Sequence, residues 1–335
     1  MNFRNISQLS DQLLDWSKRL PRDIDVVVGI PRSGLLAANL FALYRNIALA
    51  ELDGFLEGRC LSSGSTRRNL LNTASGTSSP YFLERPRKVL VLDDSARSGK
   101  TLREARRRIA ASLMSFHDVH FAAVYATADT LHDLDFYCEL LEPPRVFEWN
   151  IFNHHILEES CVDLDGVLCH DPTPEDNDDG PNYLEFISNA RPLVTTSYRI
   201  GYIVTSRLER YRKETECWLK ENAITYKELI MLDYPDGNTR RQLNTHSAHK
   251  ARFYKKTRAK LFIESDIRQA VEIVSLSKKD VLCTDSMQLI SVGSLPIGRP
   301  SRILEDHHRR SLPILLLRRL LPPKARATIR RIVSS

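Results

Sequence analysis

Apolar runs of strand length alternate with segments of helical character in the first half of the chain. Residues 24–30 (IDVVVGI) and 88–92 (KVLVL) are two such runs, and each is followed by a short polar turn. Continuous apolar runs bounded by turn residues are typical of strands buried on both faces of a parallel sheet. The pattern also predicts helices over 5–20, over 35–44 and from about 101 to 114, and strands over 120–126 and 145–149.

A second series of strands begins near residue 160. The segment 161–166 (CVDLDG) passes from apolar to acidic, and predicted strands over 202–204 and 260–263 also end at polar residues. Strands that alternate with helices indicate parallel sheets, and a chain of 335 residues is long enough for two domains. We therefore predict an α/β protein with two parallel-sheet domains.

We predict two domains, over 1–152 and 156–296, followed by a tail over 297–335. The tail differs from the two domains in its net charge. Residues 298–335 carry ten Lys/Arg and two Asp/Glu, a net charge of +8 against +6 for the whole chain. The rest of the chain is therefore slightly acidic, which argues against a nucleic-acid partner. With 42% hydrophobic and 27% charged residues, the composition is that of an ordinary globular protein.

The six cysteines form no C-x-x-C pair and no zinc-binding spacing. Scattered cysteines fit a reducing compartment. No signal-peptide pattern is found at the N-terminus, and no apolar run approaches the roughly 20 residues of a membrane span. We therefore expect a cytoplasmic protein.

The first candidate site is the turn after the strand over 88–92. Asp93 and Asp94 lead into a polar loop over 95–101 and then a helix. Ligands bind at the carboxyl ends of strands in open parallel sheets, and loop N–H groups before a helix favour phosphate. Adjacent carboxylates suit the vicinal hydroxyls of a ribose. The turn is not a P-loop, since the first glycine of that motif would fall on Asp94. A polar turn without a ligand is the alternative, but two adjacent carboxylates repel each other unless something binds them.

The segment VLVLDDSARSGKT resembles the 5-phosphoribosyl 1-diphosphate (PRPP) motif of the type I phosphoribosyltransferases. The resemblance implies that Asp93 and Asp94 hold the ribose and stabilise an oxocarbenium-like state, with Mg²⁺ accompanying the diphosphate. The upstream GIPRSG resembles the diphosphate-binding turn, and the polar loop over 54–80 lies where the family has a mobile lid. Arg32, or Arg67 of that loop, would stabilise the leaving diphosphate. The implied PRPP-binding residues are Arg32, Ser33, Gly34, Ser95, Ala96, Arg97, Ser98, Gly99, Lys100 and Thr101.

The second candidate site begins with two aspartates at the end of a strand. Asp163 and Asp165 are two residues apart, so their side chains are expected on one side of the strand. One aspartate can attack phosphorus while the other transfers a proton. A Mg²⁺ beside these carboxylates needs a further acid from a neighbouring strand, which Glu264 or Asp266 can supply.

The segment CVDLDGVLC resembles the first motif of haloacid-dehalogenase-type phosphatases, and further motifs follow in order. The resemblance implies that Asp163 is the nucleophile and a metal ligand. It makes Asp165 the acid/base, with a backbone carbonyl on Mg²⁺. Thr205 of YIVTSR would bind the phosphoryl oxygen, and Lys250 would neutralise charge, with Lys255 and Lys256 as alternatives. The metal acids are then Glu264 or Asp266 of FIESD. The short spacing between motifs leaves no room for a large cap, so we predict a Rossmann-like domain without one.

The tail pairs a leucine cluster with arginines over residues 309–331. Too short to span a bilayer, this segment could lie on an anionic membrane surface. The alternatives are a helix packed on the protein and, less favoured, binding to nucleic acid.

Together the two sites resemble the dual-domain ribofuranosyltransferases of bacterial surface-polysaccharide assembly. That resemblance implies transfer of 5-phosphoribosyl from PRPP to a glycan acceptor and then hydrolysis of the 5-phosphate. A lipid-linked acceptor would place the protein at the inner face of the cell membrane. One alternative is nucleotide salvage by a nucleobase phosphoribosyltransferase fused to a nucleotidase. Another is a PRPP-sensing regulatory module joined to a phosphatase.

Overall fold

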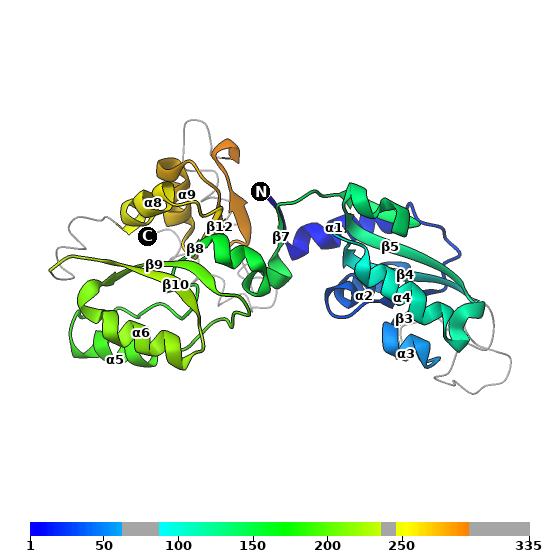
Figure 1. Cartoon of the computed structure of the whole chain (residues 1–335), viewed down its shortest axis with the longest axis horizontal. Coiled ribbons are helices and arrows are strands. Elements are labelled where there is room, and N and C mark those ends of the chain that lie inside the picture. Colours follow the sequence, from blue (N-terminus) through cyan, green and yellow to red (C-terminus); the bar gives the residue numbers. More distant parts are fainter. Residues whose placement is uncertain (62–86, 236–245, 295–335) are drawn as a thin grey trace, which may run out of the picture. The chain divides into compact units, whose positions relative to one another are not determined.

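The computed structural model describes residues 1–61, 87–235 and 246–294 (Figure 1). The chain divides into two compact units, Met1–Ile151 and Phe152–Ser335. Each unit contains its own predominantly parallel sheet, so the predicted α/β class is confirmed. The predicted tail lies outside the described residues, as do residues 62–80 of the predicted lid, including Arg67.

The first unit contains a five-stranded sheet in which every neighbouring pair is parallel. Its strands, in sheet order, are β3 (Ala48–Glu51), β2 (Val26–Gly29), β4 (Lys88–Ser95), β5 (Asp118–Ala126) and β6 (Phe136–Leu140). A small parallel pair, β1 (Asn2–Arg4) and β7 (Arg145–Phe147), completes the unit's strands within the described residues.

Helices cover both faces of this sheet because its central strands are apolar on both faces. Alternate residues of β4 enter two separate cores, Leu90 on one face and Val89 on the other. The first core includes residues of α1 (Ile6–Ser17) and α2 (Ser33–Arg45), and the second includes residues of α3 (Leu52–Leu56) and α4 (Lys100–Ala110). The continuous apolar runs in the sequence therefore reflect burial on two faces.

The first unit contains the 3-10 helices η1 (Leu113–Phe116) and η2 (Ala128–Asp133), and a third, η3 (Glu148–Asn153), begins in it and ends two residues beyond Ile151. The strand predicted over 145–149 therefore ends at Phe147 and continues as η3. The loop predicted over 54–80 is also corrected at its start, where α3 occupies residues 52–56. Glu51 caps that helix, because its carboxylate accepts the N–H groups of Asp53 and Gly54.

The second unit contains a six-stranded sheet that is parallel except for its last strand. In sheet order the strands are β10 (Tyr226–Leu232), β9 (Ile200–Leu208), β8 (Ser160–Val162), β11 (Leu261–Glu264), β12 (Val281–Cys283) and β13 (Gln288–Ile290). The helices are α5 (Pro181–Asn189), α6 (Arg212–Glu221), α8 (His246–Lys256) and α9 (Ile267–Ser277). The short 3-10 helices are η4 (His155–Glu159), η5 (Glu209–Tyr211) and η6 (Val292–Ser294).

Helices α8 and α9 lie on one face of this sheet and α5 and α6 on the other (Figure 1). Between β8 and β9 the structure contains one regular helix, α5. Within the described ranges no helix is long and apolar enough to cross a membrane.

Both sheets reverse their strand order beside the strand that comes first along the chain. In the first unit β3 and β4 lie on opposite sides of β2, and in the second β9 and β11 lie on opposite sides of β8. Such a reversal opens a crevice at the carboxyl ends of the two strands, where ligands bind in open parallel sheets. The turns after β2 and β4, and those after β8 and β11, are therefore the expected ligand positions.

Phe262, in the middle of β11, belongs to the core that α8 and α9 form with the sheet of the second unit. Its side chain is fully buried, and its ring meets the Tyr254 ring edge-on at 5.5 Å between centroids. We expect Phe262→Ala to lower the free energy of unfolding by about 3–5 kcal/mol, because it leaves a cavity. Urea denaturation measures this change, with Leu184→Ala at an exposed position of α5 as the control. Equal stability of the two variants would contradict the assignment of Phe262 to the core.

Two candidate active sites at strand ends

The first site lies where the turn after β2 meets the end of β4. Asp93 and Asp94 are both buried near the end of β4. The Ser33 hydroxyl, at the start of α2, donates to Asp94 Oδ1 at 2.8 Å, and the Trp149 indole N–H donates to Asp94 Oδ2 at 2.8 Å. The Asp94 N–H donates to Asp93 Oδ1. Burial raises the pKa of Asp93 well above its usual value, and the neighbouring charge of Asp94 raises it further.

Gly34 allows the turn after β2 to approach β4 closely. A Cβ atom on Gly34 would lie 2.8 Å from Asp93 Oδ1 and 2.9 Å from the Leu92 carbonyl oxygen. Any side chain at this position would therefore displace the first carboxylate. Arg32, two residues before Gly34, is exposed, and the peptide bond between Pro31 and Arg32 is cis. The predicted diphosphate turn and the predicted ribose carboxylates thus lie side by side.

The predicted phosphate loop divides into a sheet-bound start and an exposed tip. Ala96 is buried and its N–H donates to the Tyr125 carbonyl, so this amide is already used by the fold. Gly99 precedes α4 as its N-cap residue, has a positive φ of 66°, and offers no side chain to cap the helix. The side chains of the tip are exposed; these are Arg97, Ser98, Lys100 and Thr101. The amides at the start of α4 are consequently the ones best placed for a phosphate.

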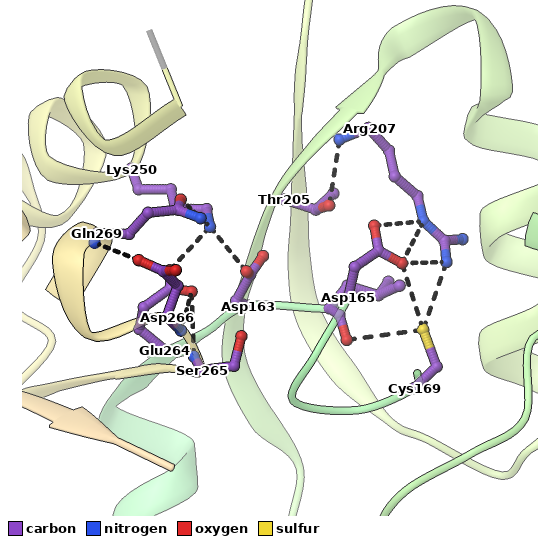
Figure 2. Close-up of polar contacts among 11 residues, drawn as sticks. Asp163, Asp165, Cys169, Thr205, Arg207, Lys250, Glu264, Ser265, Asp266 and Gln269 are labelled. Carbon is purple, nitrogen blue, oxygen red and sulfur yellow. Dashed lines mark hydrogen bonds and ion pairs between the residues drawn. The ribbon is translucent and has the colours of Figure 1, made fainter. Parts of the chain in front are cut away.

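The second site is a buried cluster at the ends of β8 and β11 (Figure 2). The Lys250 ammonium donates to Asp163 Oδ2 at 2.7 Å, to Glu264 Oε2 at 2.8 Å and to Gln269 Oε1 at 3.0 Å. The strand register causes this meeting, because the Asp163 N–H donates to the Ile263 carbonyl, one residue before Glu264. Lys255 and Lys256, the alternatives to Lys250, are exposed at the end of α8.

Burial and charge act in opposite directions in this cluster. Burial raises the pKa of Asp163, and the Lys250 ammonium opposes that change. For Lys250 burial alone would lower the pKa, but the two carboxylates outweigh it and raise the pKa. The amine is therefore held in its charged form by its three acceptors.

The donor set of this cluster fits Mg²⁺, which prefers oxygen ligands and often binds through one or two carboxylates, waters and substrate phosphates. Ionised Asp163 and Glu264 carry two negative charges against the single positive charge of Lys250. Glu264 faces this cluster, whereas Asp266 caps α9 by accepting the N–H groups of Arg268 and Gln269. Across the described ranges, no group of three or more His, Cys, Asp or Glu side chains is arranged to coordinate a metal ion.

Asp165 belongs to a separate polar group beside this cluster (Figure 2). Its carboxylate accepts Arg207 Nη2 at 2.7 Å and Arg207 Nε at 3.1 and 3.2 Å, and the Arg207 side chain is fully buried. The Cys169 thiol also lies 3.3 Å from Asp165 Oδ1. Thr205 accepts the Arg207 N–H through its hydroxyl oxygen, and a hydroxyl that accepts there can still donate its own hydrogen.

Sequence reasoning did not single out Arg207, Gln269 or Trp149, which contact predicted site residues. Arg207 could have been found, since it follows Thr205 by two residues on β9 and so lies on the same side of that strand. Gln269 had a weaker signal, three residues after the helix-capping Asp266. Trp149 had none, because its contact with Asp94 joins positions 55 residues apart.

Removing the amine tests the charge balance of the second site. We expect Lys250→Met to lower the free energy of unfolding by about 3–5 kcal/mol, since it leaves two buried carboxylates without a cation. Adding Glu264→Gln should recover part of the loss by removing one of the charges. Urea denaturation provides the measurement, and Lys255→Met is the matched control on the same helix. If both single variants unfold alike, Lys250 is not the counter-charge of this cluster.

Comparison with known proteins identifies the first unit. The family profile described as phosphoribosyl transferase domain matches residues 2–155. Among solved structures, a purine phosphoribosyltransferase from Pyrococcus horikoshii is 15% identical and covers 44% of this chain and 95% of its own, with a TM-score of 0.32. The xanthine-guanine-hypoxanthine phosphoribosyltransferase of Helicobacter pylori is 12% identical and covers 45% and 92%, with a TM-score of 0.31. A search of curated protein sequences finds no match. From the profile match, residues 2–155 of this chain form a phosphoribosyltransferase-type domain.

Proposed function

We propose that this chain transfers 5-phosphoribosyl from PRPP to a glycan hydroxyl and then hydrolyses the 5-phosphate, leaving a ribofuranosyl residue. One observation carries the proposal: a single chain holds two carboxylate sites, each at the reversal point of a parallel sheet. The first lies in the phosphoribosyltransferase-type domain. The second groups Asp163, Lys250 and Glu264 around one buried point, with Thr205 on the adjacent strand. A transferase followed by a phosphatase acting on the same sugar uses both.

The first step forms a glycosidic bond at the anomeric carbon. The acceptor hydroxyl oxygen bonds to C1 of the ribose, the bond from C1 to the diphosphate breaks, and the hydroxyl proton is released. Asp93 and Asp94 would accept the ribose hydroxyls and stabilise positive charge on the ring. The amides at the start of α4 would hold the 5-phosphate, and exposed Arg32 would neutralise the leaving diphosphate.

The second step removes the 5-phosphate through a phosphoaspartate. Asp163 attacks phosphorus and the bond from phosphorus to O5 breaks. Asp165 gives the sugar oxygen a proton, which requires it to turn from Arg207 and to be protonated before this step. Water then attacks the phosphoaspartate, Asp165 takes up a proton from that water, and inorganic phosphate leaves. Thr205 would donate its hydroxyl hydrogen to a phosphoryl oxygen, and Lys250 would hold the negative charge of the phosphoaspartate.

Mg²⁺ at the second site would be held by Asp163, Glu264 and the Asp165 main-chain carbonyl, and would neutralise charge on the phosphoryl group. Asp266, as the cap of α9, would support Glu264 and Gln269 from the adjacent helix end. Binding to Asp163 and Glu264 requires the Lys250 ammonium to share these carboxylates with the cation.

The acceptor and the cellular location rest on the sequence. A lipid-linked glycan at the cytoplasmic face of the membrane would match the basic, leucine-rich segment over 309–331. Between β8 and β9 the chain has one helix and no large inserted domain. A second site without such a cover would admit a bulky glycan product.

Replacing the nucleophile separates the two steps. We expect Asp163→Asn to yield an acceptor product that still carries the 5-phosphate, because an amide cannot form the phosphoenzyme. Mass spectrometry of products made from PRPP, Mg²⁺ and candidate glycans measures this mass difference against wild type. The matched control is Asp15→Asn, the same change at an exposed position of α1, which should give the fully dephosphorylated product.

Three other results would contradict the proposal. A dephosphorylated product from Asp163→Asn would remove Asp163 from the reaction. Diphosphate release with a purine or pyrimidine but with no glycan would favour nucleotide salvage. PRPP binding without diphosphate release, whatever the acceptor, would favour a sensing module.

A further inference from the structure

Both oxygens of the Asp94 carboxylate are already held by donors from other parts of the first unit. Ser33 donates to Oδ1 and Trp149 donates to Oδ2, each at 2.8 Å. An ionised carboxylate has about four lone-pair sites, so each oxygen can accept a second hydrogen bond. The two donors therefore fix the direction of the carboxylate without using up its capacity.

The Trp149 indole is itself fixed by a stack of aromatic rings. Its ring lies 4.8 Å from the Phe147 ring at 15°, and Phe147 lies 5.2 Å from Tyr125 at 26°. The Tyr125 hydroxyl donates to Gln12 Oε1 at 2.6 Å on α1. Because Tyr125 and Phe147 are buried, the indole N–H has little freedom to leave Asp94.

Asp94 needs such support because a second buried acid, Asp93, lies next to it in the chain. Asp93 and Asp94 are adjacent and buried, and an adjacent carboxylate pair repels. Without outside donors, the Asp94 carboxylate would be free to rotate about its side-chain bonds. Ser33 and Trp149 oppose that rotation from two directions, one from the turn after β2 and the other from η3.

We propose that Trp149 is a positioning residue for PRPP, whose indole N–H holds Asp94 in the direction that accepts the ribose hydroxyls. The inference rests on the proposed function of the first domain and adds a residue to it. Groups that lock a ligand-binding side chain in place improve affinity by removing the cost of ordering it when the ligand arrives.

Trp149→Phe removes the N–H and keeps an aromatic ring on the stack. We expect the full-length variant to bind PRPP with Mg²⁺ about tenfold more weakly than wild type by isothermal titration calorimetry, since a hydrogen bond to a charged group is lost. Trp16→Phe is the matched control, because it removes another buried indole of the same domain, one that belongs to the first core. Ser33→Ala removes the other donor to Asp94 and should also weaken PRPP binding.

A double-mutant cycle separates positioning from a general structural effect. In an Asp94→Asn background, Trp149→Phe should change PRPP affinity by less than about twofold, because its partner is gone. Trp149 fluorescence gives a second readout: PRPP should alter the emission of wild type and Trp16→Phe but not that of Trp149→Phe. Circular dichroism establishes that each variant is folded.

The outcomes distinguish the inference from the proposed function. Wild-type PRPP affinity in Trp149→Phe, or an equal loss in the Asp94→Asn background, would overturn the positioning role alone. A wild-type chain that does not bind PRPP would overturn both the positioning role and the proposed function.

Discussion

The reversal of strand order at the centre of each sheet is the constraint on which both candidate sites depend. At that point two neighbouring parallel strands send their connections to opposite faces, and the carboxyl ends of such strands are where ligands bind in open parallel sheets. In the first unit this brings Ser33 and Gly34 against Asp93 and Asp94. In the second it places Asp163 beside Glu264. The same strand order thus brings carboxyl groups together at the carboxyl ends of the strands in both sheets.

The two sites hold this charge in different ways. Asp94 contacts two neutral donors, a hydroxyl and an indole, and its neighbour Asp93 has a raised pKa because of burial and the nearby charge. Asp163 and Asp165 instead contact buried cations, Lys250 and Arg207. Neutral donors leave a carboxylate pair able to receive hydroxyls and developing positive charge. A buried ammonium would suit the phosphoryl transfer proposed for the second site.

Sequence patterns predicted strands at β2, β4, β5 and β11, the α/β class and the first domain's family, because these depend on local features. No strand was predicted at β3, β6, β10 or β12. The run KVLVL predicts a strand buried on both faces, and the motif that follows it is continuous. The contacts of Asp94 with Trp149 and of Lys250 with Asp163 span 55 and 87 positions, so no local pattern contains them. Sequence likewise could not separate Glu264 from Asp266. Their different roles depend on where β11 ends and α9 begins, and boundaries of this kind are set by tertiary packing. The phosphatase assignment of the second unit stays a prediction.

The order in which the two phosphorus products appear tests the central claim most directly. Time-resolved ³¹P NMR of the full chain with PRPP, Mg²⁺ and a competent glycan acceptor follows diphosphate and inorganic phosphate together. If two carboxylate sites act in turn on one pentose, diphosphate should appear first and inorganic phosphate should follow it to an equal final amount. Inorganic phosphate that forms without diphosphate, or diphosphate that is never followed by phosphate, would contradict the account.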